Sequence, residues 1–362
     1  MNSLLQAAVR AVRAKRVLVF VDLVQDIDVL LPVILALRAE DRLAPVVRVS
    51  RWLAAESPRT AALLEAHGVP FAFVRRNEVI EGQAPPLRGI VAVLSAAESS
   101  HPAHAAGHAL ALRAAASRLP TYTLQHGFEN VGLTGVESGA ASFASDVVFC
   151  WFPAAQTPSD LPLPTRAKLV HAGRPSPVDG WRGEVEPAFD LGVFENLHWE
   201  RYSDADRAAF REGLKATAAA LPNARIVIRP HPAGSWADSL RHELAPFANI
   251  TAASAAEARR ELAGSAEILR GIKRVITTPS TIALDAALAG RPVALAAAGG
   301  ELYEPLPLLR TPEDWIAFAS APADRQALDL FRSRVLVAAD GTGTIIDRLR
   351  HDLLSAGPRI HG

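Results

Sequence analysis

The sequence predicts an α/β protein built from two doubly wound domains, each with a parallel sheet. Short apolar runs alternate with segments of helical spacing from residue 16 to 171, and again from residue 191 to 295. Between the two series the pattern lapses over 175–187, PSPVDGWRGEVEP. Alternation of this kind is typical of parallel sheets covered by helices. A chain of 362 residues also exceeds what one small core needs, which favours two domains.

The individual elements follow from the period of the apolar residues. In the first half we predict strands at 16–23, 45–49, 70–74, 89–94, 122–124, 146–152 and 169–171, and helices at 26–40, 57–67 and 103–119. In the second half we predict strands at 191–194, 225–228, 275–276 and 292–295, and helices at 204–221, 234–244, 282–288, 312–319 and 343–354. The first helix is the clearest, because apolar residues recur every three or four positions from Ile27 to Leu37.

Composition excludes several classes of protein. A hydrophobic content of 49% with a mean hydropathy of +0.14 is that of a folded globular chain, not a disordered one. The formal net charge of zero gives no electrostatic support for a nucleic-acid partner. The single Cys150 excludes a disulfide framework and a cysteine zinc site, and it suits a reducing compartment. No apolar run reaches the eighteen or so residues of a membrane span, so we expect a cytoplasmic protein.

The first sixteen residues, MNSLLQAAVRAVRAKR, are basic and have some helical periodicity. They lack an uninterrupted apolar core and a convincing cleavage site, so they make a poor signal peptide. The segment could lie on the anionic surface of the inner membrane. An ordinary surface helix is the alternative.

The segment 271–296, GIKRVITTPSTIALDAALAGRPVALA, predicts a strand, a tight turn, a helix, a glycine stop and a second strand. Ser280 or Thr281 is expected at the N-cap, and Gly290 just past the helix end. A helix entered through hydroxyl residues such as Thr278 presents unpaired backbone N–H groups and the positive end of its dipole, which together suit a phosphate. The alternative is an ordinary βαβ unit in which these residues only cap the helix.

Polar clusters follow other predicted strands, where ligands of open parallel sheets collect. In the first domain, Asp26 could orient an acceptor hydroxyl or act as a base, or merely begin its helix. His126 precedes Gly127, which allows a sharp turn, and its ordinary pKa suits proton transfer. The alternative for His126 is a structural role.

In the second domain, Arg229 and His231 stand in the sequence RPHP, whose prolines restrict the backbone. Such side chains can stabilise a phosphate leaving group, or the segment can be only a rigid loop. Glu195 and Asn196 could contact the donor or serve as a hinge.

The sequence lacks the glycine-rich dinucleotide loop, the Walker lysine loop and HExxH. His101, His104 and His108 share helical spacing, but without a nearby carboxylate or cysteine we interpret them as a solvated face. Asp26 and Asp28 open a helix and do not predict a metal site. We therefore expect no metal and no cofactor beyond a co-substrate.

Three of these segments together resemble bacterial glycosyltransferases of the two-Rossmann (GT-B) architecture. They are QHG at 125–127, RPHP at 229–232 and TPSTIALDAALAGRPV at 278–293, and they span most of the chain in order. The group that they resemble most includes CDP-glycerol glycerophosphotransferases, polysialyltransferases and β-Kdo transferases of capsule or lipopolysaccharide synthesis.

This resemblance implies two Rossmann-like domains that face a cleft. The implied parts are an acceptor domain at 1–177, a linker at 178–188, a nucleotide-sugar domain at 189–340 and, at 341–362, a C-terminal helix that crosses back to the first domain. It also implies roles for single residues: His126 matches a base, His231 a donor-phosphate ligand, Ser280 and Thr281 the hydroxyl pair of the phosphate-binding helix, and Asp285 the acidic residue one turn on. Where retaining β-Kdo transferases have an acidic pair, this chain has Gln125-His126, which favours inversion.

The function that we expect is transfer of a sugar from a CMP- or CDP-type donor to a surface polysaccharide or a lipid-linked glycan, without a metal. Two alternatives are enzymes of the same architecture: a polyol-phosphate transferase and a nucleotide-sugar 2-epimerase. A third is a non-catalytic subunit that binds a glycan or nucleotide.

Overall fold

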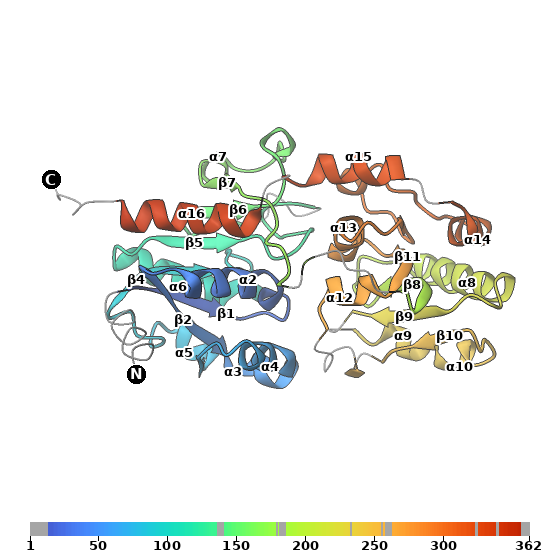
Figure 1. The fold of residues 1–362 in the computed structure, drawn as a ribbon, viewed down its shortest axis with the longest axis horizontal. Helices are drawn as coiled ribbons and strands as arrows, with labels where there is room; N and C mark the ends of the chain where they lie inside the picture. The colour runs from blue at the N-terminus through green and yellow to red at the C-terminus, as the bar shows by residue number, and fades with distance from the viewer. Residues whose placement is uncertain are drawn as a thin grey trace. The chain divides into compact units, whose positions relative to one another are not determined.

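The chain forms two units, 1–178 with 335–362 and 179–334 (Figure 1). This computed structural model describes residues 14–135, 141–178, 180, 186–231, 234–254, 256–257, 263–322, 325–337 and 340–355. Residues 1–13 of the predicted N-terminal surface segment, most of the predicted linker and Pro232 of RPHP lie outside the described residues. Among the described residues, no helix is long and apolar enough to cross a membrane.

The first unit contains a parallel sheet of seven described strands in the order β3-β2-β1-β4-β5-β6-β7. The strands are β1 Lys15–Val21, β2 Leu43–Ser50, β3 Phe71–Val74, β4 Ile90–Ser95, β5 Thr121–Leu124, β6 Val147–Cys150 and β7 Leu169–His171. The helices are α2 Asp26–Ala39, α3 Arg51–Glu56, α4 Pro58–Ala66, α5 Arg76–Ile80, α6 Ala105–Ala116, α7 Leu163–Arg166 and α16 Gly341–Leu354. Short 3-10 turns span Pro102–His104 and Ala154–Gln156.

The second unit contains a parallel sheet of five described strands in the order β10-β9-β8-β11-β12. The strands are β8 Phe189–Glu195, β9 Ile226–Pro230, β10 Ile250–Ala252, β11 Ile272–Thr277 and β12 Val293–Leu295. The helices are α8 Asp204–Ala220, α9 Trp236–Ser239, α10 Arg241–Leu244, α12 Ser265–Arg270, α13 Thr281–Leu288, α14 Pro312–Ser320 and α15 Arg325–Val335, with a 3-10 turn at Glu301–Tyr303.

These two sheets confirm the α/β class and the doubly wound organisation predicted from the sequence. The helix predicted at 57–67 is α4, which begins at Pro58, and the short helix α3 directly before it was not predicted. Proline lacks an N–H and fits only the first turn of a helix, which explains the break. The helix predicted at 234–244, in contrast, is two short helices, α9 and α10.

The C-terminal helix α16 packs against α2 of the first unit, as the resemblance implied. Lys15 Nζ donates a hydrogen bond of 2.6 Å to the carbonyl oxygen of Leu353. Arg350 forms a salt bridge of 2.7 Å with Glu40, the residue that ends α2. Chain segments more than 300 residues apart thus complete one unit.

In the second unit, helix α8 packs against α14 through an aromatic contact. The rings of Phe210 and Trp315 meet edge to face with centroids 5.3 Å apart, and both side chains are buried. Gly213 lies directly under Trp315: a Cβ added at Gly213 would come within 2.7 Å of the indole ring. Glycine in mid-helix is unfavourable, so this close approach is the reason for its presence.

We predict that Gly213→Ala destabilises the second unit. Alanine gains up to about 1 kcal/mol in helix propensity, but overpacking against a rigid buried ring costs about 1–3 kcal/mol. The expected net loss is about 1 kcal/mol in the free energy of unfolding, measured by urea denaturation. Glu212→Ala, on the exposed side of the same helix, is the control. A stabilised Gly213→Ala variant would contradict the packing argument.

Candidate functional site

Each sheet has one point where the strand order reverses, between β1 and β4 in the first unit and between β8 and β11 in the second. Loops that leave the carboxyl ends of strands on the two sides of such a point diverge and leave room for a ligand. The polar residues singled out in the sequence follow these strands or their neighbours. The two sets are described unit by unit.

The carboxylate of Asp26 holds the turn that follows β1. One oxygen of Asp26, Oδ2, accepts the backbone N–H groups of Asp22 (3.0 Å) and Leu23 (2.8 Å). The buried carboxylate of Asp22 in turn accepts hydrogen bonds of 3.1 Å from Trp52 Nε1 and Arg76 Nε. These bonds tie the end of β1 to the residues that follow β2 and β3.

The second oxygen of Asp26, Oδ1, is buried and accepts no hydrogen bond from the described residues. Burial is the main cause that raises the pKa of Asp26 to about 7. Such a carboxyl group can hold or release a proton near neutral pH. Asp26 is also the first residue of α2, so it does begin its helix, which was the structural alternative in the sequence analysis. That role uses only one of its two carboxylate oxygens.

After β5, His126 is held in one tautomer. Its Nδ1 lies 3.0 Å from the carbonyl oxygen of Ala96, which can only accept, so Nδ1 carries the hydrogen. The other ring nitrogen, Nε2, is therefore the one that can take up a proton. Burial lowers the pKa of His126, so the ring is uncharged at neutral pH. Its backbone N–H donates to the side-chain oxygen of Asn130 at 3.1 Å.

Gln125 fixes the turn that carries His126. Its side-chain nitrogen donates to the carbonyl oxygen of Gly127 at 2.9 Å, and its side-chain oxygen accepts the backbone N–H of Trp151 at 2.9 Å. The residue that replaces a carboxylate in the QHG segment is therefore a brace between the ends of β5 and β6.

The histidines at 101, 104 and 108 do not form the solvated face predicted from their spacing. His104 is buried, with Nδ1 2.6 Å from Ser99 Oγ and its ring edge to face with His126. His108 Nδ1 lies 2.7 Å from the buried carboxylate of Glu98, a partner that helical spacing alone did not show. Burial lowers the pKa of His104 to about 3, so His104 is also uncharged. The described residues contain no group of three potential metal ligands.

In the second unit, Asn196 and Thr278 join the strands on the two sides of the switch point. The Asn196 backbone N–H donates to Thr278 Oγ1 at 3.0 Å, and the Thr278 hydroxyl donates to Asn196 Oδ1 at 2.6 Å. Asn196 Nδ2 also donates to the carbonyl oxygen of Pro279 at 2.8 Å. Both side chains are buried, so these bonds fix the turn that leads into α13.

Ser280 occupies the N-cap of α13 but does not cap it through its side chain. Its hydroxyl oxygen instead lies 3.1 Å from Thr277 Oγ1. Ser280 therefore stands at the N-cap as predicted, but its side chain does not satisfy the backbone N–H groups of the first turn of α13. Thr281 is the first residue of the helix, and the buried Asp285 accepts a hydrogen bond from Ser265.

Arg229 lies in β9, and His231 directly follows that strand beside His198, a histidine that the sequence analysis did not assign to the site. The His231 backbone N–H donates to the carbonyl oxygen of Glu195 at 2.7 Å. Its ring centroid lies 5.2 Å from that of His198. Gly234 permits this arrangement, since a Cβ there would come within 2.2 Å of His198 Nδ1. Both ring nitrogens of His198 are buried without a hydrogen-bond partner among the described residues.

Burial determines the charge of the two histidines in this cluster. Burial, with a smaller contribution from His198, lowers the pKa of His231 to about 4, and burial also lowers that of His198. Both imidazoles are uncharged at pH 7 and can offer hydrogen bonds to a phosphate, while Arg229 supplies a positive charge. Glu195 holds its own loop, because its carboxylate accepts the backbone N–H groups of Leu197 and Ala237.

The structure thus brings Asn196, Thr278 and the start of α13 together, and places His198 beside His231. In the first unit the described contacts join Asp26 to Asp22, and His126 to His104, but not Asp26 to His126. His198 could have been found from the sequence, as it follows a predicted strand two residues after Asn196. His104 could not, because its spacing gives no sign of Ser99 or His126.

No protein-family model and no curated protein matches the sequence. Solved structures do match over nearly the whole chain. One is the Staphylococcus aureus MnaA–UDP structure, with a TM-score of 0.67, 13% identity and coverage of 96% of this chain and 100% of that one. The Neisseria meningitidis UDP-GlcNAc 2-epimerase bound to UDP-GlcNAc matches with a TM-score of 0.62 and 12% identity, over 92% of this chain and 99% of that one. The calicheamicin glycosyltransferase CalG4 matches with a TM-score of 0.55 and 14% identity, over 96% of this chain and 100% of that one.

The fold is GT-B. At these levels of identity the similarity shows the fold alone, and within it the epimerase structures score higher than the glycosyltransferase. Proteins with this fold include enzymes named for nucleotide sugars, which agrees with the nucleotide-sugar part of the predicted resemblance. The capsule and lipopolysaccharide transferase part is a proposal.

We predict that Asp26→Asn removes part of the pH dependence of stability. The folded-state pKa of Asp26 is raised from 3.8 to about 7, so the parent chain is stabilised below pH 4 and loses this stability as the pH rises through 7. The loss is about 1.4 kcal/mol for each pH unit between the two pKa values. Asparagine keeps an oxygen for the two backbone N–H groups and does not titrate.

The free energy of unfolding of the variant should therefore rise relative to that of the parent chain as the pH rises. Urea denaturation at pH 4.5, 6 and 8 measures this difference. Asp28→Asn, two residues away, leaves Asp26 in place and should keep the dependence of the parent chain. Parallel stability curves for Asp26→Asn and the parent chain would show that Asp26 does not titrate in this range.

Proposed function

We propose that the protein is a glycosyltransferase that uses a nucleotide-activated sugar, with the donor phosphates bound in the second unit. The observation that carries the proposal is the Asn196–Thr278 pair at the β8–β11 switch point, which fixes the turn into α13. The first N–H groups of a helix, together with hydroxyls at its start, are suited to phosphate oxygens. The similarity to solved structures that contain UDP or UDP-GlcNAc supports a nucleotide-sugar partner.

In this proposal, Ser280 and Thr281 offer hydroxyl groups to the phosphates and Arg229 offers charge. His231 and His198 donate hydrogen bonds as neutral imidazoles. Because the pKa of His231 is lowered to about 4 mainly by burial, a bound dianion would favour its protonated form. The leaving nucleotide is thus stabilised as negative charge develops on its phosphate.

The first unit would supply the base. His126 Nε2 accepts the proton of the acceptor hydroxyl, whose oxygen forms a bond to the anomeric carbon of the sugar. The bond between that carbon and the phosphate oxygen breaks, and the nucleotide leaves with its electron pair. One displacement of this kind inverts the anomeric configuration. The acceptor that we propose is a surface polysaccharide or a lipid-linked glycan, and the donor is of CMP or CDP type.

A nucleotide-sugar 2-epimerase is the second candidate, and the structural comparisons favour it over transfer. The epimerase structures have TM-scores of 0.61–0.67, against 0.54–0.55 for CalG4 and Anabaena HepE. Epimerisation requires a group that removes a proton from carbon and a group that returns one. Asp26, with its pKa of about 7, and His126 would be the residues to test.

Product analysis separates the candidates. UDP-GlcNAc, a CMP-sugar and CDP-glycerol are each incubated with the protein, with and without a glycan acceptor. Nucleotide released only with acceptor, and sugar found on the glycan, supports transfer. A UDP-sugar inverted at C2 without acceptor identifies an epimerase, and glycerol phosphate on the acceptor identifies a polyol-phosphate transferase. Tight nucleotide binding without turnover identifies a binding subunit.

We predict that His126→Ala lowers kcat by about 10² or more, because general-base catalysis contributes on that order. Donor affinity should change little, since the phosphates bind in the second unit. Steady-state kinetics and a nucleotide titration measure the two effects. His351→Ala, on the exposed face of α16, should retain full activity. Normal turnover of His126→Ala would remove this residue from the mechanism.

The pH profile of kcat/KM supplies a further prediction, because kcat/KM reports the pKa values of the free enzyme. Burial holds the pKa of His126 below its ordinary value of 6.5, so the base form persists into more acidic solution. The acid limb of the profile should therefore lie below pH 6.5. An acid limb above that value would point to another base.

A further inference from the structure

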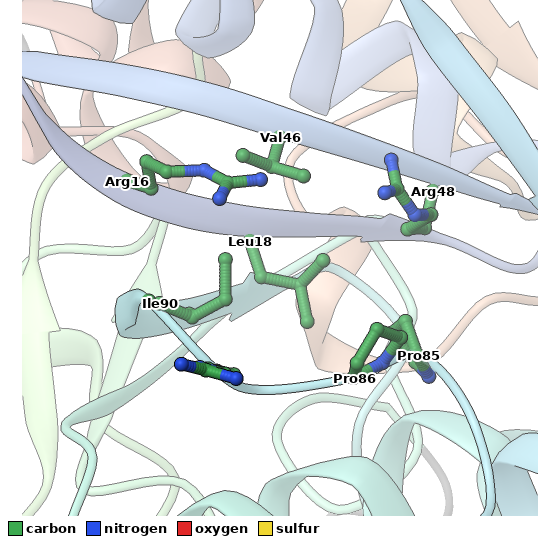
Figure 2. Close-up of a pocket in the computed structure, with 9 residues that line it drawn as sticks. Arg16, Leu18, Val46, Arg48, Pro85, Pro86 and Ile90 are labelled. Atoms are coloured by element: carbon green, nitrogen blue, oxygen red, sulfur yellow. The ribbon is translucent and has the colours of Figure 1, made fainter. Parts of the chain in front are cut away.

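A pocket of about 500 Å³ lies in the first unit, away from the residues considered so far (Figure 2). It is lined by Arg16, Leu18, Val46, Arg48, Pro85, Pro86, Arg88, Gly89 and Ile90. The lining combines aliphatic and proline side chains with three arginines, and no carboxylate takes part.

The apolar part of the pocket belongs to one face of the sheet. Leu18 of β1 is the register partner of Val46 of β2, and Arg16 is the partner of Ile90, the first residue of β4. Parallel partners present their side chains on the same side of a sheet. In Figure 2 the Arg16 guanidinium extends toward Val46, and Leu18 and Ile90 belong to the buried cluster of the core behind the pocket.

Among the described residues, the three arginines have no carboxylate partner. Arg16, Arg48 and Arg88 form no ion pair with any carboxylate of the described residues, although Arg59 and Arg350 elsewhere in this unit do. Burial and then repulsion from Arg16 lower the pKa of Arg48. Like charges gathered without a counter-charge oppose each other, and an anion between them would relieve that cost.

The connection from α5 to β4 gives the pocket a fixed wall. Arg113 of α6 donates hydrogen bonds to the carbonyl oxygens of Gly82 and Pro85. Gly89 has φ of +75°, a conformation that glycine adopts freely. A Cβ at Gly89 would lie 3.6 Å from Arg16 Nη1, so Gly89 borders the guanidinium group of Arg16. The pocket is therefore shaped before any ligand enters.

The pocket is distinct from the candidate site in the same unit. Arg16 is the second residue of β1 and Ile90 the first of β4, whereas Asp22 and Asp26 follow the opposite end of β1. Six residues of extended strand separate Arg16 from Asp22, which is roughly 20 Å.

We propose that this pocket binds the phosphate group of an amphiphilic organic phosphate, with the apolar part of that molecule on Val46 and Pro86, which are the more exposed apolar residues of the lining. Three guanidinium groups match a ligand that carries more than one negative charge, and arginine forms paired hydrogen bonds with phosphate oxygens. The source of the phosphate is either a lipid headgroup or a soluble phosphate ester. This site is independent of the proposed sugar transfer.

The test is a calorimetric titration of the full chain with n-hexyl phosphate, with hexanoate and inorganic phosphate as comparison ligands. We expect one hexyl phosphate per chain, bound at least tenfold more tightly than either comparison ligand. Arg16→Gln and Arg48→Gln should each weaken it tenfold or more. Arg42→Gln, an exposed arginine outside the lining, removes the same charge and should have little effect. Arg88→Gln, at an exposed position, tests the site if another variant unfolds.

Equal binding of hexanoate would overturn the assignment to phosphate, and undiminished binding by the arginine variants would overturn the site. Flotation with phosphatidylcholine vesicles, with and without phosphatidic acid, identifies the source. If phosphatidic acid retains the parent chain but not Arg16→Gln, the ligand is a lipid. If hexyl phosphate binds at the arginines and the vesicles do not, the ligand is soluble.

Discussion

The Asn196–Thr278 pair is the interaction on which the account of the second unit depends. It connects the ends of β8 and β11 where the sheet changes direction, and it uses buried groups that would be costly to leave unpaired. Through Asn196 Nδ2 it also holds the carbonyl oxygen of Pro279. The path of the chain into α13 is thereby fixed, and with it the direction in which the first N–H groups of that helix point.

Burial gives both candidate clusters a common electrostatic character. The imidazoles of His104, His126, His198 and His231 all have lowered pKa values, with desolvation as the main cause. Neutral imidazoles act as hydrogen-bond donors and as bases, and not as fixed charges. In the first unit this state is what a base requires. In the second it leaves the permanent positive charge to arginine.

The sequence allowed the fold class, the position of most strands along the chain and the location of the polar clusters to be predicted, because apolar period and strand-end position are local properties. Tertiary contacts decided the rest. The spacing of His104 indicated a solvated face, but Ser99 and His126 hold it inside the unit. Ser280 has the residue type of an N-cap, yet its hydroxyl pairs with Thr277. The arginine-lined pocket was not predicted, since Arg16, Arg48 and Arg88 meet only when three separate segments come together.

Hydrogen–deuterium exchange of the backbone, with and without CDP or UDP, tests the central claim most directly. If a nucleotide diphosphate binds where the Thr277–Thr281 turn enters α13, exchange should slow in peptides that cover 277–284 and 195–199. Exchange in the first unit should change much less. Protection confined to other segments, with 277–284 unaffected by a nucleotide that binds, would contradict the account.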